Sequence, residues 1–238
     1  MTATPLLISP GRLDADMLER AARGGTRWAL DPAARPAIAA SVAAVGELVA
    51  RHAPAYGINT GFGKLAQTRI ADAELAQLQT NLVLSHSAGV GAPMAPEIVR
   101  LMLLMKAASL AHGVSGVRIE VIEALIALLN ADVLPVVPEK GSVGASGDLA
   151  PLAHLAGVLI GVGDAFVRGE RMQGLCRGAV GSIHWTIDLS RPLMYALTRG
   201  TAPLIVSFPH GRASAVRLSE RPRRAGAAAT AADAERRS

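Results

Sequence analysis

Apolar residues recur at intervals of three and four along most of the first 160 positions, which is the spacing of one helix face. In residues 36–52, for example, Ile38, Val42, Val45 and Leu48 follow this interval. The same spacing predicts further helices over residues 14–23, 72–86, 95–111 and 118–130, and a long apolar helix that begins at Asp148. Asp148 is suited to cap that helix or to lie favourably at the positive end of its dipole.

Two stretches interrupt this pattern. Residues 54–70 and 131–147 are rich in glycine and proline and keep no period, so both are predicted to be irregular loops. Residues 164–172 are typical of a short hairpin or turn. Half of the chain is apolar but only 3% is aromatic, a composition that favours packed helices over a β-sandwich. The sequence therefore predicts a mainly α fold.

The net charge of +5 raises the question of nucleic-acid binding, but the charges are unevenly distributed. Residues 1–176 hold 14 basic and 15 acidic side chains, whereas residues 177–238 hold 10 arginines and 4 acidic residues. The basic surplus belongs to the last segment and forms no binding face on the rest. We expect no nucleic-acid partner.

Neither a disulfide nor a membrane segment is indicated. Cys176 is the single cysteine, so it has no partner within the chain for a disulfide or a paired-cysteine zinc site. The first residues lack the basic and apolar regions of a signal peptide. The apolar windows at residues 101–111 and 152–162 are shorter than the ~20 residues that span a bilayer. We therefore expect a cytoplasmic protein with no membrane partner, and the scattered histidines predict no metal site.

The chemistry lies in the two irregular loops. In "GASGD", residues 144–148, the Gly147 amide could attack the Ala145 carbonyl, because a glycine permits unusual backbone angles and proximity favours ring closure. Loss of two water molecules, one of them from the Ser146 side chain, would leave a strong electrophile without an external cofactor. From the residues alone, an ordinary flexible loop remains the alternative. Tyr56, likewise, is either a half-buried structural tyrosine or a general base.

The wider sequence favours the chemical alternative. "GSVGASGDLAPLAHLA" (141–156) resembles the signature of the aromatic amino acid ammonia-lyases, which make a methylidene-imidazolone from an Ala-Ser-Gly triplet. "YGINTGFGKL" (56–65) resembles their second loop, and the segments 78–91 and 116–154 match in the same order. Within this family the Ser85-His86 pair resembles the residues of the histidine-specific branch. The tyrosine and phenylalanine enzymes carry other residues at this place.

This resemblance implies a fold, a reaction and a set of roles. The fold would be the helical N-terminal portion of the ammonia-lyase (aspartase-like) fold, and the assembly a homotetramer. The reaction would convert L-histidine to urocanate and ammonia, the first step of histidine degradation. Ala145, Ser146 and Gly147 would cyclise, Tyr56 would remove a β-proton, and His86 would contact the substrate imidazole. Asn59, Gly61 and Asp148 would support the two loops.

The end of the chain departs from the family. The family continues into long helices that supply an asparagine-glycine-threonine segment, a second tyrosine, an arginine and a glutamate, and residues 177–238 contain none of these motifs. We therefore predict an ammonia-lyase domain at residues 1–172 and a divergent, arginine-rich tail at 173–238, disordered and read from a shifted frame. The alternatives are an inactive fragment of such an enzyme, or a tyrosine or phenylalanine ammonia-lyase or aminomutase.

Overall fold

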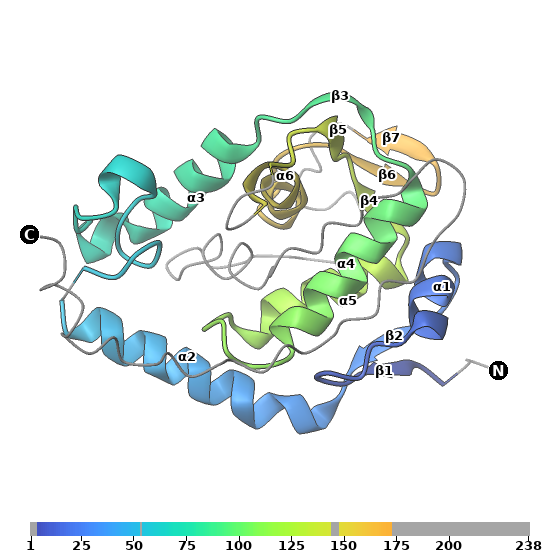
Figure 1. Ribbon diagram of the computed structural model, residues 1–238, viewed down its shortest axis with the longest axis horizontal. Coiled ribbons are helices and arrows are strands. Elements are labelled where there is room, and N and C mark those ends of the chain that lie inside the picture. Colours follow the sequence, from blue (N-terminus) through green and yellow to red (C-terminus); the bar gives the residue numbers. More distant parts are fainter. Residues whose placement is uncertain (1–3, 53, 144–147, 173–238) are drawn as a thin grey trace, which may run out of the picture. The chain divides into compact units, whose positions relative to one another are not determined.

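The computed structural model describes residues 4–52, 54–143 and 148–172 of the chain. Helices dominate these residues, as the apolar spacing predicts (Figure 1). The α-helices in this part are α1 (Ala15–Arg23), α2 (Arg35–Ala50), α3 (Leu75–His86), α4 (Pro96–Leu110), α5 (Ile119–Asn130) and α6 (Leu149–Leu159). Short 3-10 turns occur at Pro32–Ala34, Gly63–Leu65 and Asp72–Glu74. Cys176 and the tail at 173–238 lie outside the described residues.

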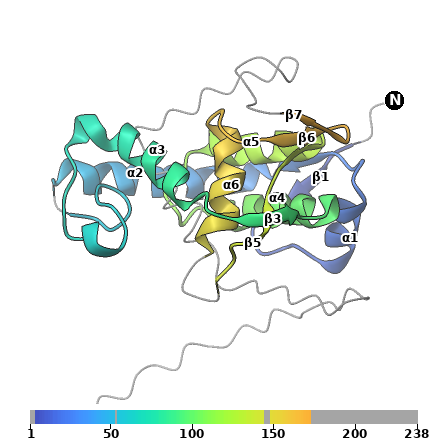
Figure 2. The same cartoon turned by 90° about the horizontal axis from the view of Figure 1, so that it is seen from above.

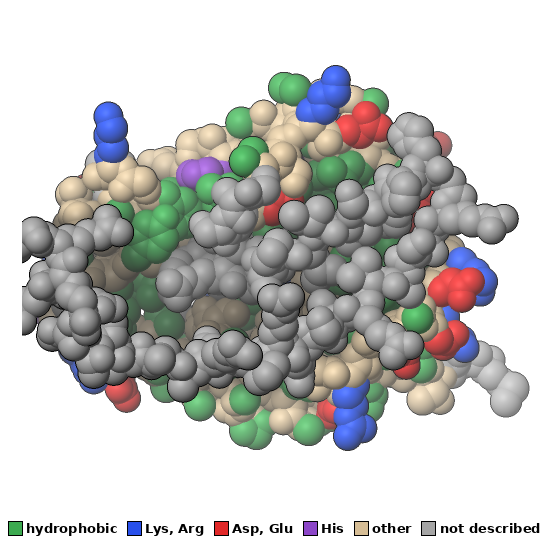
Figure 3. Space-filling model, in the orientation of Figure 1, with side chains coloured by type: hydrophobic (Ala, Val, Ile, Leu, Met, Phe, Trp, Pro, Cys, Tyr) green, Lys and Arg blue, Asp and Glu red, His purple; other side chains and the backbone are tan. Residues whose placement is uncertain are grey.

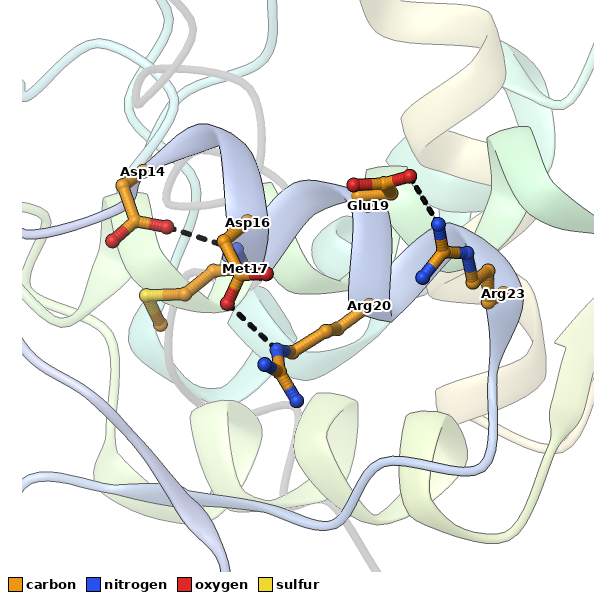
Figure 4. A network of polar contacts seen from close by, with 6 residues as sticks. All are labelled: Asp14, Asp16, Met17, Glu19, Arg20 and Arg23. Carbon is orange, nitrogen blue, oxygen red and sulfur yellow. Dashed lines mark hydrogen bonds and ion pairs between the residues drawn. The ribbon is translucent and has the colours of Figure 1, made fainter.

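The first helix shows how local sequence sets the bounds of an element. Asp14 is the N-cap of α1, where its carboxylate accepts a hydrogen bond from Met17 N at 2.9 Å (Figure 4). Along the exposed face Arg20 donates to Asp16 at 2.7 Å, and Arg23 donates to Glu19. Both pairs are four residues apart, the spacing at which helical side chains meet.

The core lies between the middle helices. α4 packs along α5 and α1, and α3 packs along α6 (Figures 1 and 2). The helices contribute fully buried leucines and isoleucines to one apolar cluster; those on α4, α5 and α6 are Leu103, Leu104, Leu110, Ile122, Leu125, Leu155 and Leu159. Burying such side chains is the main favourable term of folding.

One core position is polar. Lys106 on α4 is only 3% exposed, and its Nζ has no hydrogen-bond partner among the described residues. Because burial disfavours the charged form, it lowers the pKa of Lys106 to about 8.

Short strands join the helices. β1 (Leu6–Ile8) pairs in parallel with β2 (Trp28–Leu30), and β3 (Val90–Pro93) pairs antiparallel with β5 (Pro138–Lys140). A third sheet has the order β4 (Val133–Pro135), β6 (Ala165–Val167) and β7 (Glu170–Met172), all antiparallel. The hairpin predicted at 164–172 is thus confirmed. The prediction of an irregular stretch at 131–147 is wrong where β4 and β5 lie, because pairing with distant segments orders these three-residue strands.

A single side chain docks β2 on the end of α5. Asn130, the last residue of α5, accepts a hydrogen bond from Trp28 N at 2.8 Å. Its amide nitrogen donates to Trp28 O at 2.9 Å. The amide thus satisfies both backbone groups of Trp28, as a neighbouring strand would.

α2 is the most exposed of the apolar helices. Ile38 is the one residue of α2 that is buried among those described, and hydrophobic side chains lie exposed along the lower edge of Figure 3. The inner face of α2 packs on the turn that follows α4, where Gly116 N donates to Ser41 Oγ at 3.2 Å. A Cβ on Gly113, whose φ is +67°, would lie 2.5 Å from the Ala37 carbonyl carbon, so this turn requires glycine.

Within the described residues, Pro32–Ala50 is long and apolar enough to cross a membrane, by length and composition only. The core helix of a soluble protein and a signal sequence both pass this test, so it is weak support for a membrane segment.

Candidate active site

Tyr56 lies on a tight turn and is half exposed. The residue is 50% exposed, whereas Gly57, Ile58, Asn59 and Thr60 after it are all buried. We call residues 54–62 the Tyr56 loop. An exposed phenol on a buried turn is free to meet a ligand while its backbone stays fixed.

The predicted support residue Asn59 holds this turn together. Asn59 is fully buried, and its side-chain oxygen accepts a hydrogen bond from Ala55 N at 2.7 Å. Its backbone carbonyl accepts from Ile70 N at 2.8 Å, which ties the loop to the segment that leads into α3. Gly61, the second predicted support residue of this loop, is also buried.

Two further polar residues, which the sequence did not indicate, contact the same turn. Thr60 is fully buried, and its Oγ1 accepts a hydrogen bond from Gly57 N at 3.2 Å. Gln79 on α3 is fully buried as well, and its Nε2 donates to Gly57 O at 3.4 Å. Both contacts depend on how the chain folds back, and only the unusual polar residue on the apolar face of α3 hints at the second.

A chain of aromatic rings joins the two residues that the sequence assigned to base and substrate contact. The centroids of Tyr56 and Phe62 lie 5.4 Å apart, with the rings tilted by 39°. The centroids of Phe62 and His86 also lie 5.4 Å apart, in an edge-to-face arrangement. Such geometries are attractive. Phe62 was not singled out from the sequence, and it is the residue that brings Tyr56 and His86 into one cluster.

The ring of His86 has a defined orientation at the end of α3. Its Nδ1 lies 2.7 Å from Leu82 O, and a carbonyl oxygen can only accept, so Nδ1 carries a proton. Ser85 Oγ lies 3.2 Å from the same nitrogen. In the neutral ring Nε2 is therefore the acceptor nitrogen, and it is the one left for other partners.

The second candidate loop is described only at its ends. Ala145, Ser146 and Gly147 lie outside the described residues. Asp148 occupies the N-cap position of α6, but its carboxylate accepts from Ser142 Oγ at 2.7 Å and makes no side-chain cap bond to the described helix. Of the two roles predicted for Asp148, the side-chain cap is therefore wrong, whereas its position at the start of α6 is as predicted. The other oxygen, Asp148 Oδ1, is buried and has no partner within residues 4–52, 54–143 and 148–172.

Close packing connects the segment after His86 with α6. Gly89 N donates to His154 Nε2 at 3.1 Å, and a Cβ on Gly89 would lie 3.0 Å from that same nitrogen. A Cβ on Gly141 would lie 3.0 Å from the Gly89 Cα and 3.2 Å from the Ala150 side chain. Burial lowers the pKa of His154, which favours the neutral ring that accepts this hydrogen bond. His154 thus has a packing role.

The remaining described histidines lie away from this cluster. His52 contacts Arg69 and Asp72 on the surface, and His112 is exposed. In the part of the chain that the structure describes, no group of three or more histidine, cysteine, aspartate and glutamate side chains could hold a metal ion.

Comparison with known proteins identifies relatives of this chain. The histidine ammonia-lyase of Burkholderia pseudomallei (strain 668) is 57% identical over 166 residues, which are 70% of this chain and 33% of that protein. The chain thus spans about a third of the length of the curated relatives it matches.

Two solved structures show the same fold. The phenylalanine aminomutase of Pantoea agglomerans matches with a TM-score of 0.72 and 30% identity, over 80% of this chain and 37% of that one. The histidine ammonia-lyase of Trypanosoma cruzi matches with a TM-score of 0.64 and 32% identity, over 78% of this chain and 37% of that one. The family model described as "Aromatic amino acid lyase" matches residues 13–201. The chain therefore belongs to the aromatic amino acid lyase family, whose ammonia-lyases cleave carbon–nitrogen bonds.

Proposed function

We propose that this chain carries the base and the electrophile-forming loop of a histidine ammonia-lyase, which converts L-histidine to urocanate and ammonia. The observation that carries the proposal is the ring cluster of Tyr56, Phe62 and His86, which gathers the two side chains assigned to base and substrate contact. The 57% identity to a histidine ammonia-lyase supports L-histidine as the substrate. We place the reaction in the cytoplasm.

The hydroxyl of the half-exposed Tyr56 residue would remove the proton from the β-carbon of histidine as ammonia leaves the α-carbon. His86 would contact the substrate imidazole through Nε2, because Nδ1 is engaged with Leu82 O. A weakly acidic β-proton and a poor leaving group both require help, and a positioned base addresses the first.

The described residues at the second loop fit the methylidene-imidazolone proposed from Ala145, Ser146 and Gly147. Asp148 follows the triplet directly, and its buried Oδ1 offers an acceptor for which the described residues provide no donor. Ser142, which precedes the triplet in the sequence, donates from its Oγ to the other carboxylate oxygen. When formed, the group supplies an electron sink. No external cofactor or metal is proposed.

The first test is the intact mass of the purified chain, followed by urocanate formation measured by its ultraviolet absorbance. We expect a deficit of two water molecules that is absent in Ser146→Ala, and turnover of L-histidine that exceeds turnover of L-tyrosine and L-phenylalanine. An unmodified mass would contradict the proposal. Preference for tyrosine or phenylalanine would assign another branch of the family.

A second candidate is an inactive fragment of such an enzyme. It would show the modified mass without turnover. The homotetramer implied by the family, the 172/173 domain boundary and the frame-shifted tail remain proposals. Sedimentation of the purified chain tests the first, and sequencing of the gene for an alternative frame after about codon 173 tests the last.

A further inference from the structure

We propose that Thr60 and Gln79 are positioning residues that hold Tyr56 in place through hydrogen bonds to the backbone of the next residue, Gly57. This inference rests on the proposed role of Tyr56 as the base. Neither residue touches the substrate in this proposal. They act through the backbone of Gly57, and both of its polar groups are engaged.

The first hydrogen bond to Gly57 comes from within the Tyr56 loop. Gly57 N belongs to the peptide bond that begins at the carbonyl of Tyr56, and it donates to Thr60 Oγ1 at 3.2 Å. Thr60 Oγ1 in turn donates to Gly61 O at 3.1 Å. Ala55 O, at 3.5 Å, is a second carbonyl within reach of this hydroxyl. Because Gly57 N can only donate, the hydroxyl is the acceptor toward Gly57 and gives its one proton to either carbonyl, of which Gly61 O is the nearer.

The second hydrogen bond to Gly57 comes from a different element. Gln79 Nε2 donates to Gly57 O at 3.4 Å, across 22 positions of sequence. The bond is long, but the side chain is fully buried, and a buried amide is costly unless it is hydrogen-bonded. Gln79 is two helical turns before His86 on α3, so the helix that carries His86 also holds the backbone next to Tyr56.

Gly57 needs these external hydrogen bonds because glycine has the most conformational freedom of any residue. Gly57 has a φ of +68°, in the left-handed region that other residues rarely adopt, and glycine itself resists only weakly a change to other angles. Without external bonds the Tyr56 turn would sample other conformations. A shift of about 1 Å in a reacting group lowers rates by on the order of 10²-fold.

The test replaces each polar group by an apolar one of similar shape in the full 238-residue chain. Thr60→Val and Gln79→Met are compared with Thr80→Val and Gln77→Met, the same changes at less buried positions of α3. The chain has two tyrosines, so ¹⁹F NMR of the protein labelled with 3-fluorotyrosine gives two signals, assigned with Tyr56→Phe.

We expect Thr60→Val and Gln79→Met to shift or broaden the Tyr56 signal while the Tyr195 signal and the circular dichroism stay unchanged. The two controls should leave both signals as in the parent. A parental Tyr56 signal in both test variants would overturn the proposal. Loss of the folded circular dichroism in both would also overturn it, since the residues would then be structural.

Turnover provides the independent readout. If the parent converts histidine, the two test variants should lose kcat by on the order of 10- to 100-fold with KM changed less than about threefold. A rise in KM with kcat unchanged would contradict a positioning role. If the parent has no turnover, the proposed function fails, while the NMR comparison still decides whether Thr60 and Gln79 hold Tyr56.

Discussion

The Tyr56 loop and the α4–α5 core lie in the same chain but are held by different interactions. The backbone of the loop is fixed by hydrogen bonds from buried side chains, Asn59 and Thr60 within the loop and Gln79 on α3. In the core, apolar contacts fix the backbone, and Lys106, a buried charged residue there, has no partner for its Nζ among the described residues. Loop substitutions should therefore change geometry before stability, and core substitutions the reverse.

The largest effect is expected in the core. Leu125→Ala removes a fully buried side chain of α5 and should lower the free energy of unfolding by about 2–5 kcal/mol. Leu84→Ala, at a position on α3 that is half exposed, should cost less than about 0.5 kcal/mol. Urea denaturation followed by circular dichroism measures both. Similar losses in the two variants would show that the core is not packed as described.

The next prediction concerns the charge in that core. Lys106→Met should raise the free energy of unfolding at pH 7 by about 1–3 kcal/mol, because it removes the desolvation of an unpaired ammonium. The unfolded chain binds this proton up to about pH 10.5, whereas the folded chain releases it near pH 8. Parental stability should therefore rise between these pH values, and the variant should lack that rise.

Denaturation at pH 7 and pH 10 tests this, with Lys140→Met on the exposed β5 as the control. If the free energy of unfolding changes with pH in the same way in the parent and in Lys106→Met, the ammonium has a partner. The comparison between loop and core then loses its clearest example.

A smaller effect is expected where the loop meets α3. Phe62→Leu breaks both ring contacts and should cost about 1 kcal/mol more than Phe166→Leu on β6, which has no ring contact within the described residues. Urea denaturation of the two variants gives the difference. Equal costs would mean that Phe62 contributes only apolar area and does not link Tyr56 to His86.

The smallest effect belongs to the joint between Gly89 and α6. The pKa of His154 is lowered by burial, so the unfolded chain takes up a proton below about pH 6.5 that the folded chain resists. The parent should lose stability as the pH falls from 7 to 5, and His154→Gln should lose less. The exposed His112→Gln should behave like the parent. Identical losses in all three would assign the acid sensitivity to other groups.

Most of the fold was predictable because helices depend on nearby residues. The spacing of apolar positions placed α1 to α6 within a few residues of their bounds, and Asp14 marked the start of α1. The strands β1, β2, β3, β4 and β5 were missed, since three or four residues carry too little pattern and their partners are distant.

The candidate site was predictable in part, for a different reason. Tyr56, Asn59 and His86 were found through resemblance to a family. Phe62, Thr60 and Gln79 matter through contacts that span 24, 3 and 22 positions, and the two longer ones join separate elements. Asp148 was placed correctly at the start of α6, but its partner Ser142 is set by the folded path of the loop.

The amide of Asn130 has a consequence for how copies of the protein meet. An open strand edge is a template on which another chain can add, and short sheets must guard it. β2 has three residues, and alternate residues direct their backbone groups to opposite sides of a strand. Since Asn130 occupies both groups of Trp28, Leu30 alone is left to offer that edge. One side chain at a helix end thus occupies part of the β2 edge, where a further strand would otherwise pair.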